Sequence, residues 1–176
     1  MAKLLLEKVT ECDPSILNPW HNLGLIYLDT HDSSKAIHCF EKVISLSPKD
    51  PFALLALIRL CAYEEKFAAA LKYCENLIST GLETKQSFIY KVQLLNQLDR
   101  YTEAVECIKR ATRNDPSNDL PWFMLSEIAE GAKDYPTSFI VSLEFQKIQL
   151  RNNIKTSRDL ERIQERIHRL KIYLGP

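Results

Sequence analysis

The stretch from Trp20 to Pro48, WHNLGLIYLDTHDSSKAIHCFEKVISLSP, decides the fold because its pattern recurs along the chain. Large apolar residues stand 34 residues apart in one register: Trp20, Leu54, Phe88 and Trp122. Small residues keep the same spacing in a second register: Ala36, Ala70, Ala104 and Ser138. A third register is proline at three of its five places: Pro14, Pro48, Leu82, Pro116 and Leu150. A fixed period of this length indicates a repeat architecture.

Each period is predicted to hold two amphipathic helices joined by a short polar turn. Apolar residues such as Leu23 and Tyr27, and then Phe40, recur at helical intervals on the two sides of the turn. The small side chain of Ala36 lets the second helix lie close against the first. Pro48 ends the pair because proline has no N–H with which to continue a helix.

The stretch resembles the tetratricopeptide repeat signature at Trp20, Leu23, Gly24, Tyr27, Ala36, Phe40 and Pro48. The resemblance covers about residues 1–152 and predicts repeats at 17–50, 51–84, 85–118 and 119–152. It implies an all-α fold, a right-handed superhelical solenoid of antiparallel helix pairs. Ile58 and Val92 occupy the position of Gly24, where the family usually has a small residue, so closer packing is expected in the first repeat than in the next two.

Both ends of the chain depart from a whole repeat. Residues 1–16 resemble the second helix of a unit without its first, since Ala2, Leu6 and Val9 lie one period before the matching apolar positions. We expect a chain cut from a longer array, with a natural N-terminal cap as the alternative. Residues 153–176 are predicted to form a basic capping helix, which begins at a capping box over 156–159 and shields the last repeat from water.

The composition limits the function classes. The chain has 176 residues, 45% hydrophobic and 26% charged, which is typical of a soluble protein. Its four glycines are too scattered for a Gly-rich phosphate loop. Its five cysteines form no CxxC pair, so neither a disulfide framework nor a zinc ribbon is indicated. The apolar runs are too short for a signal peptide or a membrane span, so we expect a cytoplasmic protein, with the nucleus as the alternative.

Catalytic patterns are absent from the sequence. The four histidines make no HxxxH or HExxH motif, and no serine lies in GxSxG. The cysteines fall on repeat positions, where buried small hydrophobic residues explain them better than nucleophiles do. We therefore expect a protein that is not an enzyme and that holds no metal and no cofactor.

The candidate binding surface is the concave face, which in tetratricopeptide folds is lined mainly by the first helix of each unit. The expected groove residues, a mixture of apolar and polar side chains, are Asn18, His21, Asn22, Leu25, Phe52, Leu55, Arg59, Tyr63, Gln86, Ile89, Tyr90, Gln93, Phe123, Met124 and Glu127. They suit an amphipathic helix or an extended peptide. Packing of some of them against neighbouring helices, or under the C-terminal helix, is the alternative.

Two narrower hypotheses can be weighed. Tetratricopeptide co-chaperones bind the C-terminal carboxylate of heat-shock proteins through Lys, Arg and Asn side chains. The matching positions here supply no cation, which excludes such a clamp: His21, Leu25, Ala56, Gln86 and Tyr90.

The tail from residue 151 has seven basic and three acidic residues, and its arginines form a stripe: Arg158, Arg162, Arg166 and Arg169. A solvated face of the capping helix, or docking on an acidic partner, is favoured over nucleic-acid binding, because no aromatic residues interleave.

The sequence therefore predicts a non-catalytic scaffold or adaptor that binds a peptide or helix of another protein, within a larger multiprotein complex. A regulatory or targeting arm of a longer enzyme chain is the first alternative. Nucleic-acid binding through the basic C-terminal helix is the second. Self-association stays open.

Overall fold

The computed structural model describes residues 2–81, 84–152 and 158–174, and within them every regular element is an α-helix. The chain forms two compact units, which we call unit 1 (Met1–Leu98) and unit 2 (Asp99–Pro176). Their boundary lies between the two helices of the predicted repeat 85–118. Thr156 and Ser157, which the sequence assigns to a capping box, lie outside the described residues. None of the described helices is both long enough and apolar enough to cross a bilayer.

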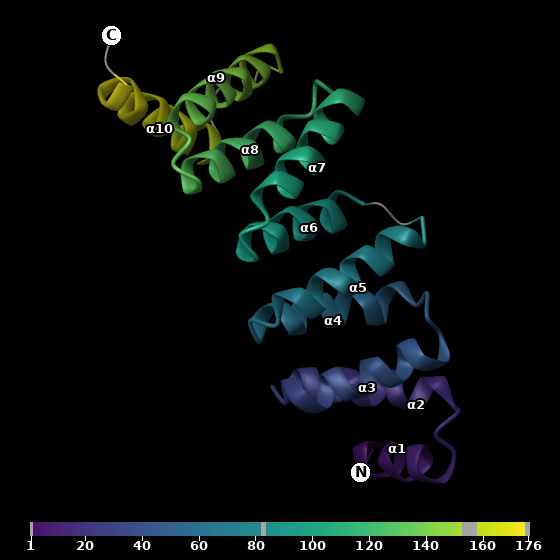
Figure 1. Ribbon diagram of the computed structural model, residues 1–176. Helices are drawn as coiled ribbons and strands as arrows, with labels where there is room; N and C mark the ends of the chain where they lie inside the picture. Colours follow the sequence, from purple (N-terminus) through teal and green to yellow (C-terminus); the bar gives the residue numbers. More distant parts are fainter. Residues whose placement is uncertain (1, 82–83, 153–157, 175–176) are drawn as a thin grey trace. The chain divides into compact units, whose positions relative to one another are not determined.

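Unit 1 contains α1 (Ala2–Cys12), α2 (Leu17–Asp29), α3 (Ser33–Leu46), α4 (Pro51–Tyr63), α5 (Phe67–Ser79) and α6 (Lys85–Gln97) (Figure 1). Unit 2 contains α7 (Tyr101–Asn114), α8 (Asp119–Gly131), α9 (Tyr135–Arg151) and α10 (Arg158–Leu174). The helices α2, α4, α6 and α8 begin 34 residues apart, and so do α3, α5, α7 and α9. The expected all-α helical repeat solenoid is confirmed, whereas its right-handed superhelical coiling stays a prediction.

Each first helix ends in the same tight turn, made by a non-glycine residue with positive φ. These residues also stand 34 apart: His31, Glu65, Asp99 and Lys133, with φ between 56° and 60°. In the first repeat the N–H of Asp32 donates to the carbonyl of Tyr27 at 2.9 Å, which closes the turn as in a Schellman motif. The left-handed conformation reverses the chain in three residues and places the second helix beside the first.

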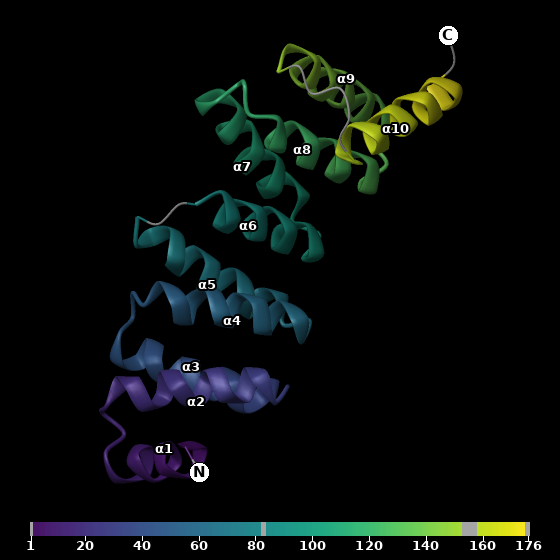
Figure 2. The ribbon, with the colours of Figure 1, turned by 180° about the vertical axis from the view of Figure 1, so that it is seen from behind.

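In unit 1 each helix packs against the next, from α1 on α2 to α5 on α6 (Figures 1 and 2). One core cluster is built from the buried faces of α2, α3 and α4: Leu23, Tyr27, Ala36, Cys39, Phe40, Val43, Ala53, Leu57 and Leu60. The small residues that stand 34 apart lie where two helices meet: Ala36 and Ala70 have no exposed surface. The apolar faces that the sequence pattern predicts therefore pack against one another between neighbouring helices of unit 1.

In unit 2, α8 packs between α7 and α9, and α10 packs on α9. The apolar stripe of α10 joins a second core cluster, made of Phe145, Leu160, Ile163 and Ile167, against which Trp122 and Phe123 pack. Ser138 is fully buried in the small register and donates from Oγ to the carbonyl of Ser126 at 3.2 Å. The C-terminal helix is therefore an integral part of this unit.

Candidate functional site

A hollow of about 830 Å³ opens on the surface of unit 1. Its walls come from the end of α2, the turn into α3, and the outward faces of α4 and α6. Six of the expected groove residues line it: Phe52, Leu55, Arg59, Tyr63, Gln86 and Tyr90. The structure therefore brings together in one concavity side chains from two first helices that are one period apart.

The helix α4 supplies half of the residues that line the hollow. Asp50 caps its N-terminus, with Oδ1 accepting a hydrogen bond from the N–H of Ala53 at 2.8 Å, and Pro51 occupies the first turn. The helix buries one face in the core, including Leu57 and Ile58. The opposite stripe, at helical intervals of three and four, then faces the hollow: Phe52, Leu55, Arg59 and Tyr63.

Exposed aromatic rings are the main apolar feature of the hollow. Phe52 is 50% exposed, and its ring lies 4.8 Å from that of His21 and 6.4 Å from that of buried Phe40, measured between centroids. Tyr63 is 79% exposed. On α6, Nε2 of Gln86 donates to the hydroxyl of Tyr90 at 3.4 Å. Phe52 is therefore held by neighbouring rings, and both Phe52 and Tyr63 present surface to a ligand.

The charged side chains of the hollow are the basic Arg59 and the acidic Asp29, and His31 also lies in the lining. Arg59 is exposed and makes no ion pair with any residue that the structure describes. A guanidinium group can donate two parallel hydrogen bonds to a carboxylate or bind backbone carbonyls. The hollow thus combines apolar side chains with one guanidinium group that has no ion-pair partner among the described residues.

The other groove residues of unit 1 lie outside the hollow. Asn18, Asn22 and Gln93 are exposed. His21, Leu25 and Ile89 are half-buried. Sequence reasoning missed part of the lining, namely Tyr27, Leu28, His31, Ser33, Ala56, Leu60 and Ala62. Most of these lie near the end of a first helix or in the turn, and only the backbone reversal after α2 brings that turn to the hollow.

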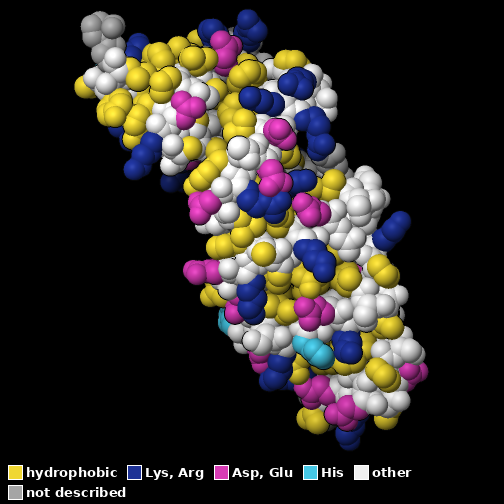
Figure 3. Space-filling view, in the orientation of Figure 1, with side chains coloured by type: hydrophobic (Ala, Val, Ile, Leu, Met, Phe, Trp, Pro, Cys, Tyr) yellow, Lys and Arg dark blue, Asp and Glu magenta, His cyan; other side chains and the backbone are white. Residues whose placement is uncertain are grey.

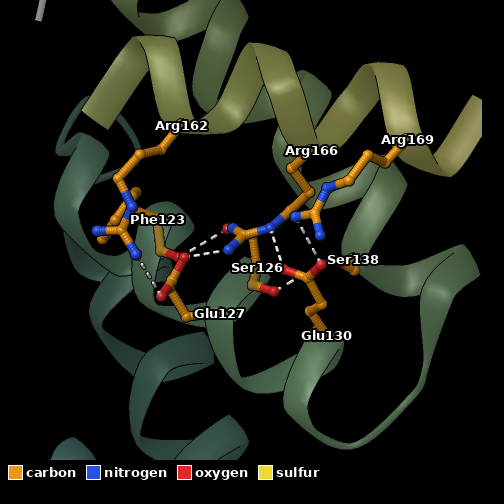
Figure 4. A network of polar contacts seen from close by, with 8 residues as sticks. All are labelled: Phe123, Ser126, Glu127, Glu130, Ser138, Arg162, Arg166 and Arg169. Atoms are coloured by element: carbon orange, nitrogen blue, oxygen red, sulfur yellow. Dashed lines mark hydrogen bonds and ion pairs between the residues drawn. The ribbon is translucent and has the colours of Figure 1, made fainter. Parts of the chain in front are cut away.

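In unit 2 the expected face of α8 is covered by α10 (Figure 4). Met124 is buried, and the ring of Phe123 lies 5.7 Å from that of Phe145 and 5.4 Å from the guanidinium carbon of Arg162. Glu127 accepts a hydrogen bond from Arg162 at 3.1 Å. Phe123, Met124 and Glu127 therefore take part in contacts within the unit, as the alternative of packing under the C-terminal helix expects.

The arginine stripe of α10 faces acidic side chains of its own unit. Arg166, whose side chain is 6% exposed, donates to Glu127, to Glu130 and, at 2.7 Å, to Oγ of Ser126. Arg169 donates to Glu130 at 3.0 Å. Figure 4 shows Arg166 reaching between the two carboxylates. Of the four arginines expected on an anionic-partner face, Arg162, Arg166 and Arg169 bind α8, while Arg158 is exposed at the start of α10.

Burial raises the pKa of the Cys39 thiol to about 11 and also raises the pKa of Cys61. Among the described residues, no group of three or more His, Cys, Asp or Glu side chains is arranged to hold a metal ion.

Three solved structures resemble this chain in fold. MamA (41-end) from Desulfovibrio magneticus RS-1 is 15% identical, with a TM-score of 0.67 over 88% of this chain and 86% of that one. YrrB, a TPR protein with an unusual peptide-binding site, is 11% identical, with a TM-score of 0.61 over 94% and 92% of the two chains. Naa15/Naa10 bound to HypK-THB gives 13% identity and a TM-score of 0.74 over 97% of this chain and 26% of that one.

Two segments of the chain also match the tetratricopeptide repeat family, at residues 18–50 and 91–118. The first segment spans α2 and α3. With the helical repeat seen in the structure, these matches identify the chain as a tetratricopeptide repeat protein.

Proposed function

We propose that this protein-interaction scaffold binds a short segment of a partner protein in the hollow of unit 1. The segment carries apolar or aromatic side chains for Phe52 and Tyr63 and a carboxylate for Arg59. The observation that carries the proposal is the convergence of exposed aromatic rings and an unpaired guanidinium in one concavity of about 830 Å³. Such a volume is within the range of small-ligand and peptide subsites.

The similarity to YrrB, which has a peptide-binding site, supports the same use of this fold here. Tetratricopeptide repeats generally act as non-catalytic scaffolds, and a rigid stack of helices presents preformed surface without an ordering cost. The neighbour Naa15/Naa10 bound to HypK-THB is an assembly of several proteins. We extend the proposal to a role of this chain within a multiprotein complex.

A peptide selection tests the proposal. A random peptide library is panned against the whole chain, and the affinity of each selected peptide is measured by fluorescence anisotropy. Peptides that occupy the hollow should contain Asp or Glu beside an apolar residue. Arg59→Glu should weaken their binding about tenfold or more, because it replaces an attraction by a repulsion, whereas Arg59→Lys should retain most of it.

Tyr63→Ala should also weaken binding, since Tyr63 is a large exposed ring in the lining. Tyr173→Ala is the matched control, because Tyr173 is 69% exposed but belongs to α10 in unit 2. Equal affinity of parent, Arg59→Glu and Tyr63→Ala for every selected peptide would show that the hollow is not the binding site.

A further inference from the structure

The hollow of unit 1 contains two side chains of opposite charge, Arg59 and Asp29. Arg59 lies on the outward face of α4, and Asp29 is the last residue of α2. Both side chains are exposed, and neither makes an ion pair with any residue in the described part of the chain. Each of the two charges is therefore free to bind the complementary group of a ligand that enters the hollow.

The end of the hollow at Asp29 favours a cation for a second reason. The helix α2 ends at Asp29, and the carbonyl groups at the C-terminus of a helix carry a partial negative charge that acts over the last turn. The neighbouring lining residues, His31 and Ser33, come from the turn and from the start of α3. A basic group of a ligand is expected at this end of the hollow.

The two charges also stand at different levels of the repeat. Asp29 precedes Tyr63 by 34 residues, so it has on α2 the position that Tyr63 has on α4. Arg59 lies about one helical turn before Tyr63. The positions of Arg59 and Asp29 therefore differ along the first helices as well as between them. A ligand that binds both charges is held in one direction.

We propose that the segment bound in the hollow carries one acidic and one basic side chain, with the carboxylate on Arg59 and a Lys or Arg side chain on Asp29. This inference rests on the proposed function and adds to it the second charge and the direction of the segment. A purely acidic segment would gain an attraction at Arg59 and meet a repulsion at Asp29.

The surface around the hollow supports recognition by a local pair of charges. On the face of unit 1 that Figure 3 shows, Lys and Arg side chains are interspersed with Asp and Glu, and neither sign gathers in a broad patch. A broad patch of one sign would attract any partner of the opposite charge. An isolated pair of opposite charges selects instead for the order of the charges in the ligand.

Synthetic peptides with acetylated and amidated ends test the inference. Each peptide has a short randomised apolar centre, which is flanked by Glu and then Lys in one set and by Lys and then Glu in a second set. In two matching sets Gln replaces Lys. The affinity of each set for the whole chain is measured at low salt by anisotropy of a fluorescent label. The decisive quantity is the affinity ratio, which is the affinity of a Lys set divided by that of its Gln counterpart.

In the parent the affinity ratio should be about three to five for one order of charges, the size expected of an exposed ion pair, and about one for the other order. Asp29→Asn should lower the higher ratio to about one, without weakening the binding of the Gln sets. Glu75→Gln is the matched control and should leave the ratio unchanged, because Glu75 is exposed on α5 and does not line the hollow. The double variant Asp29→Lys, Arg59→Glu should reverse the preferred order.

Three results would overturn the inference: a ratio near one for both orders in the parent, a ratio that Asp29→Asn leaves unchanged, or the same preferred order in the double variant. Binding of the Gln sets that Arg59→Glu weakens would still support the proposed function in each of these cases. Absence of binding by every set would contradict both.

Discussion

Gly24 of α2 lies so close to the ring of Phe40 in α3 that a Cβ atom added to the glycine would be 2.7 Å from the end of the ring. Phe40 has no exposed surface and packs beside Phe52, so its ring has little room to move. Gly24→Ala should therefore destabilise unit 1. Overpacking costs about 1–3 kcal/mol and outweighs the gain of about 1 kcal/mol in helix propensity, for a net loss of about 1 kcal/mol.

Urea unfolding followed by circular dichroism measures this loss. Gly131→Ala is the matched control, because Gly131 also lies in a first helix and an added Cβ would have no neighbour within 4 Å. It should be neutral or stabilising by about 0.5 kcal/mol. The same response from both variants would mean that contact with Phe40 does not select the glycine.

The close packing at Gly24 could be expected from the sequence, but its counterpart in the next repeat was only partly foreseeable. Ile58 stands at the glycine position of α4, which suggested a looser contact, yet Ile58 has no exposed surface. The position of Phe40 holds Cys74 in α5, which is equally buried. A large residue on the first helix and a small one on the second thus replace the opposite arrangement. The exchange becomes visible only when the position of Gly24 and Ile58 is compared together with the position of Phe40 and Cys74.

The hydrogen bond from Tyr27 to Glu7 makes the docking of α1 depend on pH. It raises the pKa of Tyr27 to about 12. Because this pKa is above the ordinary value of 10.0, the stabilisation is fully present below pH 10 and is lost as the pH rises through about 12. The parent should be about 1 kcal/mol more stable than Tyr27→Phe at pH 8, and this difference should shrink toward pH 12.

Urea titrations of parent and variant across this pH range provide the measurement. Tyr63→Phe serves as the control, because the Tyr63 side chain is exposed and should change stability by less than about 0.5 kcal/mol at any pH. A difference between parent and Tyr27→Phe that stays constant up to pH 12 would contradict the assigned role of the hydrogen bond.

The buried thiols of Cys39 and Cys61 should react more slowly with alkylating reagents than the exposed thiol of Cys12. Burial raises the pKa of Cys39 to about 11, so the thiolate that reacts with alkylating reagents is scarce at pH 8. Cys12 is exposed at the end of α1. Iodoacetamide at pH 8 should modify Cys12 first, and Cys39 and Cys61 should react only after denaturation, as mass spectrometry of peptides can show. Fast alkylation of Cys39 in the folded protein would revive the nucleophile hypothesis.

Two features of the structure were only partly foreseeable from the sequence, for different physical reasons. The left-handed turns fall on His31, Glu65, Asp99 and Lys133, and because none is a glycine, no residue type marks them. The cover of α8 by α10 did leave a signal. Glu127 and Glu130 are spaced like Arg166 and Arg169, but matching stripes on two helices show contact only once their packing is known.

The ion-pair network at Arg166 should hold α10 on unit 2. Arg166→Ala leaves Glu127 and Glu130 without their shared partner (Figure 4). Loss of one partner of a buried pair costs about 3–5 kcal/mol, and partial exposure of the two carboxylates reduces the expected loss to about 2 kcal/mol. Amide hydrogen exchange in α10 should accelerate accordingly. Arg158→Ala, on the same helix but exposed, should leave exchange unchanged. If both variants exchange like the parent, the apolar stripe alone holds α10 in place.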